Sequence, residues 1–209
     1  MKAQSQIRLA VFLSGSGTTL QNLLDRCSTP DFPASVQLVI ASKPTAYGLE
    51  RAKKANIQAE VVVRKHFDNV DDFSQVLFEH CRNREIDLVC LAGFMHLIRV
   101  PEDFTNRVIN VHPSLIPAFC GKGYYGSRVH QAVLDFGAKV SGCTVHFADN
   151  EYDHGPIILQ KAVPVLDDDT AESLASRVQE AEREVFPEAV RLFAQGKLHI
   201  DGQRVRISS

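Results

Sequence analysis

Val108-Ile109-Asn110-Val111-His112-Pro113-Ser114-Leu115-Ile116-Pro117 is a short β-branched run that meets a proline. Such residues favour a strand, and Pro113 cannot extend a central strand because it has no N–H to donate. Asn110 and His112 are two residues apart, so they share a face near the strand's carboxyl end, where open α/β sheets bind ligands. An amide that can donate to an oxyanion beside a proton-carrying imidazole suits acyl transfer. A buried pair satisfied by backbone groups would give the same pattern.

On both sides of this segment, strand patterns alternate with helix patterns. Buried or alternating apolar runs predict strands at residues 7–13, 36–41, 60–63, 86–91, 139–148 and 157–165, and a terminal hairpin at 198–207. Helical patterns cover residues 18–26, 48–55, 70–84, 127–136 and 171–194. Regular alternation predicts right-handed crossovers and an α/β fold. We expect a Rossmann-like, mostly parallel twisted sheet with flanking helices and antiparallel strands toward the C-terminal half.

Composition limits the class of protein. With 209 residues, of which 44% are hydrophobic and 23% charged, the chain can bury a sizeable core in one domain or two merged lobes. A net charge of −2 argues against nucleic acid as the main partner. No apolar stretch reaches about 18 residues, so we expect neither secretion nor a membrane span. Five cysteines without a Cys-x-x-Cys pair indicate reduced thiols in a cytoplasm rather than disulfides or thiolate zinc.

The first strand runs into a small-residue turn, Ser14-Gly15-Ser16-Gly17-Thr18-Thr19, before a helix. A strand, turn and helix start of this kind can bind an anion through backbone N–H groups and the helix dipole. Leu20 stands where a dinucleotide fingerprint has Gly or Ala, and no Lys follows as a Walker loop requires. The turn therefore favours a single phosphate, while a tight turn without a ligand is the alternative.

Two later loops also carry polar residues. Residues 118–126 contain three glycines in six residues and two tyrosines, which favours a mobile or ligand-approaching loop. The acidic segment 149–156 by itself resembles an exposed hairpin loop. Residues 92–98, which leave the fourth strand, look locally like packing, with His96 as a solvated loop residue.

Four motifs in one register together resemble the phosphoribosylglycinamide formyltransferases, folate-dependent enzymes of purine synthesis. They lie at residues 14–20, 91–95, 110–117 and 153–158, and the match runs from about residue 7 to 193. The resemblance implies a single formyltransferase domain over residues 1–209. Its phosphate-binding half would cover about 1–108, and its folate-binding and catalytic half about 109–209. The loop at 121–126 resembles one branch of the family.

The resemblance also implies the site residues. Asn110, His112 and Asp153 match the catalytic trio, which reverses the local interpretation of the acidic turn. The ribonucleotide would bind to Gly17, Thr18, Thr19, Gln179 and Glu182, with Glu182 as the most direct ligand and Thr19 replacing a usual Asn. The folate would bind to Met95, His96, Leu97, Ile98, Asn110, Asp149, Tyr152 and Asp153. His96 stands where an Arg is common, and Val70 where some members place one. The peptide before Pro117 matches a cis position.

The implied reaction is formyl transfer from 10-formyltetrahydrofolate, the co-substrate, to the amine of glycinamide ribonucleotide. Asn110 would donate to the tetrahedral oxyanion. His112, charged by proximity to Asp153, would add electrostatic stabilisation and act as general acid, while water or Asp153 carries away the proton of the amine. No metal and no covalent enzyme intermediate are required. We expect a cytoplasmic enzyme with these two small-molecule partners, without nucleic acid or membrane, and compatible with a homodimer.

Three other functions share part of this pattern. A formyltetrahydrofolate hydrolase could share the trio, although that family adds a regulatory domain before the catalytic one, and here the first strand begins at Ile7. Another folate-dependent formyltransferase, acting on initiator tRNA, would need an RNA-binding domain and a basic face. A non-catalytic nucleotide-binding module would explain residues 14–20 and leave the other motifs unexplained.

Overall fold

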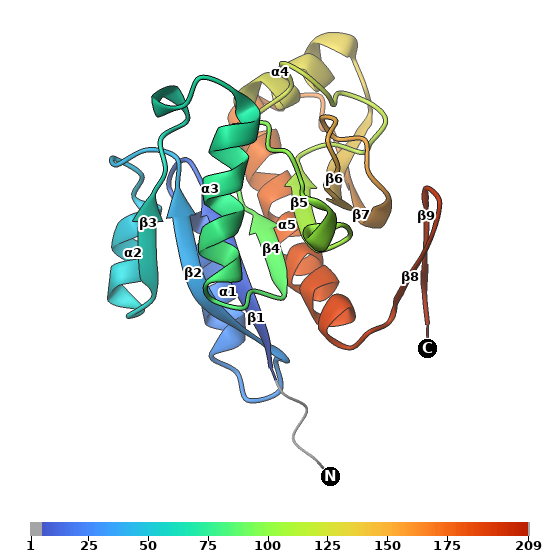
Figure 1. Ribbon diagram of the computed structural model, residues 1–209. Coiled ribbons are helices and arrows are strands. Elements are labelled where there is room, and N and C mark those ends of the chain that lie inside the picture. The colour runs from blue at the N-terminus through green and yellow to red at the C-terminus, as the bar shows by residue number, and fades with distance from the viewer. Residues whose placement is uncertain (1–5, 209) are drawn as a thin grey trace.

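The predicted alternation of strands and helices is present in the computed structural model, which describes residues 6–208 (Figure 1). The strands are β1 (Ile7–Leu13), β2 (Ala34–Ala41), β3 (Gln58–Val61), β4 (Leu88–Leu91), β5 (Val108–His112), β6 (Val140–Phe147), β7 (Ile157–Pro164), β8 (Leu198–Asp201) and β9 (Arg204–Ile207). The α-helices are α1 (Thr18–Cys27), α2 (Gly48–Lys54), α3 (Val70–Arg82), α4 (Ser127–Phe136) and α5 (Ala171–Ala194), with short 3-10 turns at Arg64–His66 and Glu102–Phe104.

Every predicted element exists, and the differences lie at the ends. β3 begins and ends two residues earlier than predicted. β4 begins at Leu88 instead of residue 86 because the turn after α3 extends further. In that turn Glu85 adopts a left-handed backbone with φ 48°, and the N–H of Ile86 donates back to the carbonyl of Cys81. Residues 86 and 87 are therefore still part of the turn.

Within the described residues the nine strands form one sheet in the order β3-β2-β1-β4-β5-β6-β7-β9-β8. Neighbours from β3 to β5 are parallel, whereas β5–β6, β6–β7 and β8–β9 are antiparallel. This confirms the mixed sheet expected from the sequence. The chain moves outward from β1 to β3 and then returns to place β4 on the other side of β1. The carboxyl ends of β1 and β4 therefore meet at a switch point, where ligands bind in open α/β sheets.

Helices cover both faces of the sheet (Figure 1). Alternate residues of β1 point to opposite faces: Leu9 and Val11 join the core under α1 and α5, whereas Phe12 joins the core under α3. These three side chains are fully buried. Full burial of a large apolar side chain stabilises the fold by about 1.5–3 kcal/mol. β1 is therefore packed on both faces, which fixes the position of its carboxyl end.

Local sequence features define the last long helix. Thr170 caps α5 by accepting from the N–H of Ser173, whose hydroxyl in turn accepts from the N–H of Thr170. Asp169 forms an ion pair with Arg177, which fastens the first turns of α5. Among the helices that the structure describes, none is both long and apolar enough to cross a membrane.

Candidate active site

A cavity of about 850 Å³ lies at the carboxyl ends of β1, β4 and β5. It is lined by every residue that the sequence predicted for the site: Gly17, Thr18, Thr19, Met95, His96, Leu97, Ile98, Asn110, His112, Asp149, Tyr152, Asp153, Gln179 and Glu182. These residues come from the first crossover, the loop after β4, the strand β5, the β6–β7 turn and α5. The fold therefore gathers positions that are far apart in the chain.

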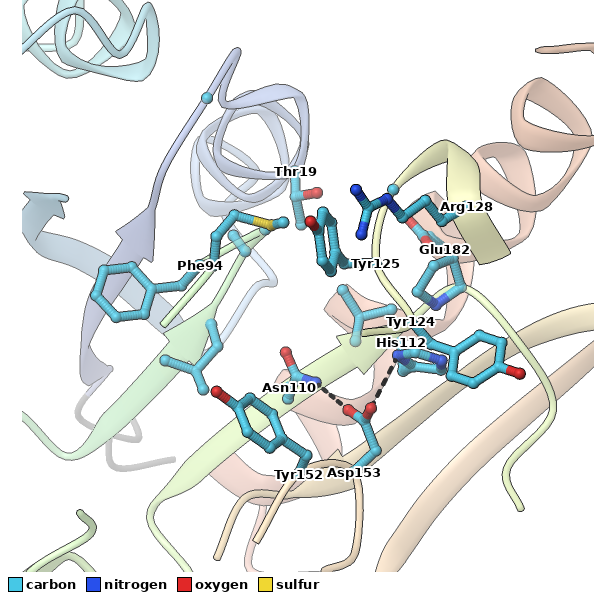
Figure 2. Close-up of a pocket in the computed structure, with 18 of the residues that line it drawn as sticks. Thr19, Phe94, Asn110, His112, Tyr124, Tyr125, Arg128, Tyr152, Asp153 and Glu182 are labelled. Atoms are coloured by element: carbon cyan, nitrogen blue, oxygen red, sulfur yellow. Dashed lines mark hydrogen bonds and ion pairs between the residues drawn. The ribbon is translucent and has the colours of Figure 1, made fainter. Parts of the chain in front are cut away.

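The predicted trio meets at the floor of the cavity (Figure 2). β5 supplies Asn110 and His112 from one face, and Asp153 approaches from the β6–β7 turn. Nδ1 of His112 lies 3.4 Å from Oδ2 of Asp153, and Nδ2 of Asn110 lies 3.4 Å from Oδ1 of the same carboxylate. Asp153 has a left-handed backbone with φ 54°, a conformation that costs energy for a non-glycine residue and that aims its carboxylate between the two side chains.

The structure contradicts the expectation that Asp153 keeps His112 charged. Burial lowers the pKa of His112 below its ordinary value of 6.5, and the nearby carboxylate of Asp153 opposes this only in part. Nε2 of His112 lies 2.9 Å from the carbonyl of Phe119, so that nitrogen carries the proton of the neutral ring. The imidazole is therefore neutral at pH 7, rather than charged by Asp153.

Asp153 is the ionised member of the trio. Burial by itself raises the pKa of Asp153. Contacts with His146 and His112 and the N–H of Gly121 lower this pKa by a larger amount, so the net shift is downward. The N–H of Gly121 donates to Oδ2 at 2.8 Å. The floor of the cavity thus combines a carboxylate with two imidazoles.

His146 on β6 is part of this network and was not predicted from the sequence. β5 and β6 place it directly opposite Asn110. Nδ1 of His146 donates to the carbonyl of Phe147 at 2.8 Å, which leaves Nε2 to accept from Nδ2 of Asn110 at 3.1 Å. One amide hydrogen of Asn110 is therefore fixed. The other makes only the long 3.4 Å contact with Asp153 and can donate to a ligand.

His130 on α4 was also missed by the sequence reasoning. It is buried, lines the cavity, and its Nδ1 has no hydrogen-bond partner among residues 6–208. Burial, with a further contribution from His112, lowers the pKa of His130. The apolar spacing of α4 gave no signal that this histidine faces a cavity.

The first crossover forms an anion-binding turn. Gly17 has φ 70°, and a Cβ there would lie 2.8 Å from Cα of Gly48, so both the conformation and the packing require glycine. α1 begins at Thr18 without a side-chain cap, which leaves the N–H groups of its first turn available to a ligand. Arg51 stabilises the turn by donating hydrogen bonds to the carbonyl of Ser16 and to the side-chain oxygen of Gln21.

α5 forms the wall beside this turn. Gln179 and Glu182 line the main cavity and also a small recess that they share with Thr18 and Thr19. Burial raises the pKa of Glu182 to about 7. At neutral pH this carboxyl group can therefore donate or accept a hydrogen bond, which suits the hydroxyl groups of a sugar.

The opposite side of the cavity is more apolar. His96 packs edge-on against Phe73 and Phe94, with ring centroids 5.9 and 5.6 Å apart, instead of being a solvated loop residue. Burial lowers the pKa of His96, and the cations of Lys43 and Arg64 lower it further. This wall suits a planar, largely apolar ring system.

The turn before β7 closes the apolar side. Asp149 accepts from Nδ1 of His154 at 2.7 Å, so it stabilises the turn itself. Asn150 accepts from the N–H of Val100 at 2.9 Å, which ties the turn to the segment after residue 98. Tyr152 is exposed at the mouth of the cavity (Figure 2). The acidic segment is thus a wall of the site and not only a hairpin loop.

One further expectation is confirmed nearby. The peptide between Ile116 and Pro117 is cis. The five cysteines are free. Among the described residues, no group of three His, Cys, Asp or Glu side chains is arranged to hold a metal ion.

Comparison with known proteins identifies a matching family and similar proteins. A family model described as formyl transferase matches residues 7–190. A Haemophilus influenzae protein named phosphoribosylglycinamide formyltransferase is 35% identical over 195 residues, which cover 92% of this chain and 90% of that protein. The trifunctional purine biosynthetic protein adenosine-3 of Bos taurus is 41% identical over 202 residues, and the chain spans only 19% of its length. The crystal structure of glycinamide ribonucleotide transformylase 1 from Symbiobacterium toebii superposes with a TM-score of 0.91 at 45% identity, covering 98% of this chain and 95% of that one.

Proposed function

Because this chain belongs to the formyl transferase family, we propose that it transfers the formyl group of 10-formyltetrahydrofolate to the amine of N1-(5-phospho-D-ribosyl)glycinamide, a step of purine biosynthesis. The observation that carries the proposal is the position of Asn110, His112 and Asp153. They lie on the floor of a cavity between an anion-binding turn and an apolar wall. A ribonucleotide and a folate would meet above them.

Each substrate has a matching side. The phosphate of the ribonucleotide would bind at Gly17, Thr18 and Thr19, and its ribose hydroxyls would reach Gln179 and Glu182. The folate ring would lie against the segment 95–98, with Asp149 and Tyr152 beyond it. The absence of an Arg at residues 70 and 96 leaves the folate's acidic tail to other residues.

The chemical step follows from the hydrogen bonds. The amine attacks the formyl carbon, and the carbonyl oxygen becomes an oxyanion that the free N–H of Asn110 can stabilise. The neutral His112 takes a proton from the attacking nitrogen and returns it to N10 of the folate as the C–N10 bond breaks. Asp153 stabilises the imidazolium during this transfer. Atoms and protons balance without a covalent enzyme intermediate.

An acceptor comparison tests the function. Purified protein with 10-formyltetrahydrofolate should form the formyl product with glycinamide ribonucleotide, and neither release formate with water alone nor formylate initiator tRNA. Rapid formate release would indicate a hydrolase, and formylation of the tRNA a different formyltransferase. Failure of all three reactions would favour a nucleotide-binding module. The cytoplasm is the proposed compartment, and sedimentation would test the proposed homodimer.

A further inference from the structure

The charges that line the cavity are unevenly placed. Its permanent cations among residues 6–208 are Lys122, in the loop between β5 and α4, and Arg128, in the first turn of α4. The turn at residues 15–19 contributes backbone N–H groups and hydroxyls but no cation. Five carboxyl groups also line the cavity: Asp149, Glu151, Asp153, Glu172 and Glu182. A dianion bound at the turn would therefore lack a counter-charge unless Lys122 or Arg128 supplies one.

Two other cations near the turn are already engaged. Arg51 lies behind it and donates to the carbonyl of Ser16 and to Gln21. Arg183 lines the small recess and forms an ion pair with Glu180. Arg128 differs from both, because it forms no ion pair and its side chain makes no hydrogen bond with any residue from 6 to 208.

Arg128 is nevertheless held in place. Its guanidinium carbon lies 4.9 Å from the centroid of the Tyr125 ring, within cation–π distance. In Figure 2, Arg128 of α4 and Tyr125 of the preceding loop extend toward the side of the cavity where Thr19 lies. Stacking of this kind restricts the side chain and leaves the N–H groups of the guanidinium free.

The loop backbone supports this position. Gly121, Gly123 and Gly126 have φ of 90°, 98° and 54°, values that other residues adopt rarely. The N–H of Gly121 donates to Asp153 on the floor, and Gly126 leads directly into α4. The loop is thus anchored at both ends, with Tyr125 and Arg128 beside the second anchor.

We propose that Arg128, positioned by Tyr125, binds the phosphate of the acceptor substrate opposite the turn at residues 15–19 and selects phosphorylated over unphosphorylated acceptors. A guanidinium fork matches two phosphate oxygens, and its charge balances the dianion. The proposal rests on the proposed function, because it names the group that recognises one part of the acceptor. It also explains why a loop rich in tyrosine and glycine lines the cavity.

The decisive kinetic test compares two acceptors. Arg128→Gln and the matched control Lys122→Gln, which removes the other cation that lines the cavity, are assayed with glycinamide ribonucleotide and with its dephosphorylated riboside. Arg128→Gln should lower kcat/KM for the ribonucleotide by about tenfold to a hundredfold, mainly through KM, as expected for a lost charged hydrogen bond. It should leave the riboside and the KM of the folate unchanged. Equal losses with both acceptors, or a larger effect of Lys122→Gln, would overturn the proposal.

A binding measurement keeps the test independent of activity. Calorimetry with inorganic phosphate should give weaker binding to Arg128→Gln than to the wild type, with Arg128→Lys intermediate. Tyr125→Phe should retain binding and Tyr125→Ala should weaken it. Unchanged phosphate affinity in Arg128→Gln, or no phosphate binding to the wild type at millimolar concentration, contradicts the proposal. If phosphate binding follows Arg128 but no formyl transfer occurs, the proposed function fails while this inference stands.

Discussion

The backbone N–H of Gly121 donates to the carboxylate of Asp153 at 2.8 Å. The same oxygen lies 3.4 Å from the imidazole of His112. Because a hydrogen bond to the charged form lowers the pKa of a carboxyl group, the position of the loop and the charge of the trio depend on each other. The loop that leads to Arg128 at the start of α4 therefore also contacts the group that assists proton transfer.

Replacement of Asn110 by Ala should lower kcat by roughly a hundredfold or more, because it removes the N–H that can reach an oxyanion. The thermal unfolding midpoint should change little, since Asn110 is only half-buried. Steady-state kinetics with both substrates saturating measure the effect. Near-normal turnover in the purified variant would contradict the role of Asn110.

The acid limb of the pH profile should lie below pH 6.5, the ordinary value for histidine, because burial lowers the pKa of His112 and the neutral ring is the active form. Activity is then constant near pH 7 and falls as pH drops through the lowered pKa. His112→Ala should cut turnover by roughly a hundredfold or more. An acid limb above 6.5 would mean that the charged ring is active.

Asp153→Asn should move that acid limb to still lower pH, because Asp153 is the main group that raises the pKa of His112 against burial. Turnover should also fall, while folate affinity should change less. A fluorescence titration with a folate analogue separates the two effects. If folate binding is lost while the chemical step survives, Asp153 is a folate ligand instead.

Glu182→Gln should stabilise the protein against unfolding at pH 8, measured without substrates. Burial raises the folded-state pKa of Glu182 from 4.5 to about 7, so its favourable contribution is complete below 4.5 and is lost as pH rises to 7. The variant, which carries no charge, should gain about 1 to 3 kcal/mol at pH 8 relative to pH 4. Urea unfolding at both pH values measures this. A variant less stable than the wild type at pH 8 would show that Glu182 is not isolated from solvent.

Gly17→Ala should raise the KM for the ribonucleotide more than that for the folate and destabilise the fold by about 1 to 3 kcal/mol, because the position is left-handed and a Cβ would meet Gly48. Gly15→Ala is the matched control. A Cβ at Gly15 meets nothing within 4 Å, and we expect wild-type unfolding there. Equal destabilisation by both substitutions would contradict the steric explanation.

Periodicity in the sequence was sufficient to predict every α-helix and strand that the structure describes, because each apolar face packs against a hydrophobic core. Two-residue spacing was sufficient to place Asn110 and His112 on one face. The ends of β4 could not be predicted, since they depend on the left-handed backbone of Glu85.

The electrostatics of the site were less predictable. The pairing of Asn110 with His146 depends on strand register, which local pattern does not determine. The charge of His112 depends on how deeply the ring is buried among elements that are distant in sequence. For that reason the expectation of a charged ring was wrong. The contact between Gly121 and Asp153 joins two loops, and neither loop's sequence indicates that it contacts the other.

The switch point between β1 and β4 has a consequence for how the protein is made. Ser14 accepts from the N–H of Met95, although α1, β2, α2, β3, α3 and β4 lie between them in the chain. Asp153 and Glu182 join later still. Contacts of such long sequence separation form slowly, so a nascent chain leaving the ribosome has no complete cavity until α5 has emerged. The substrates can therefore stabilise only the finished fold and give no help to its folding intermediates.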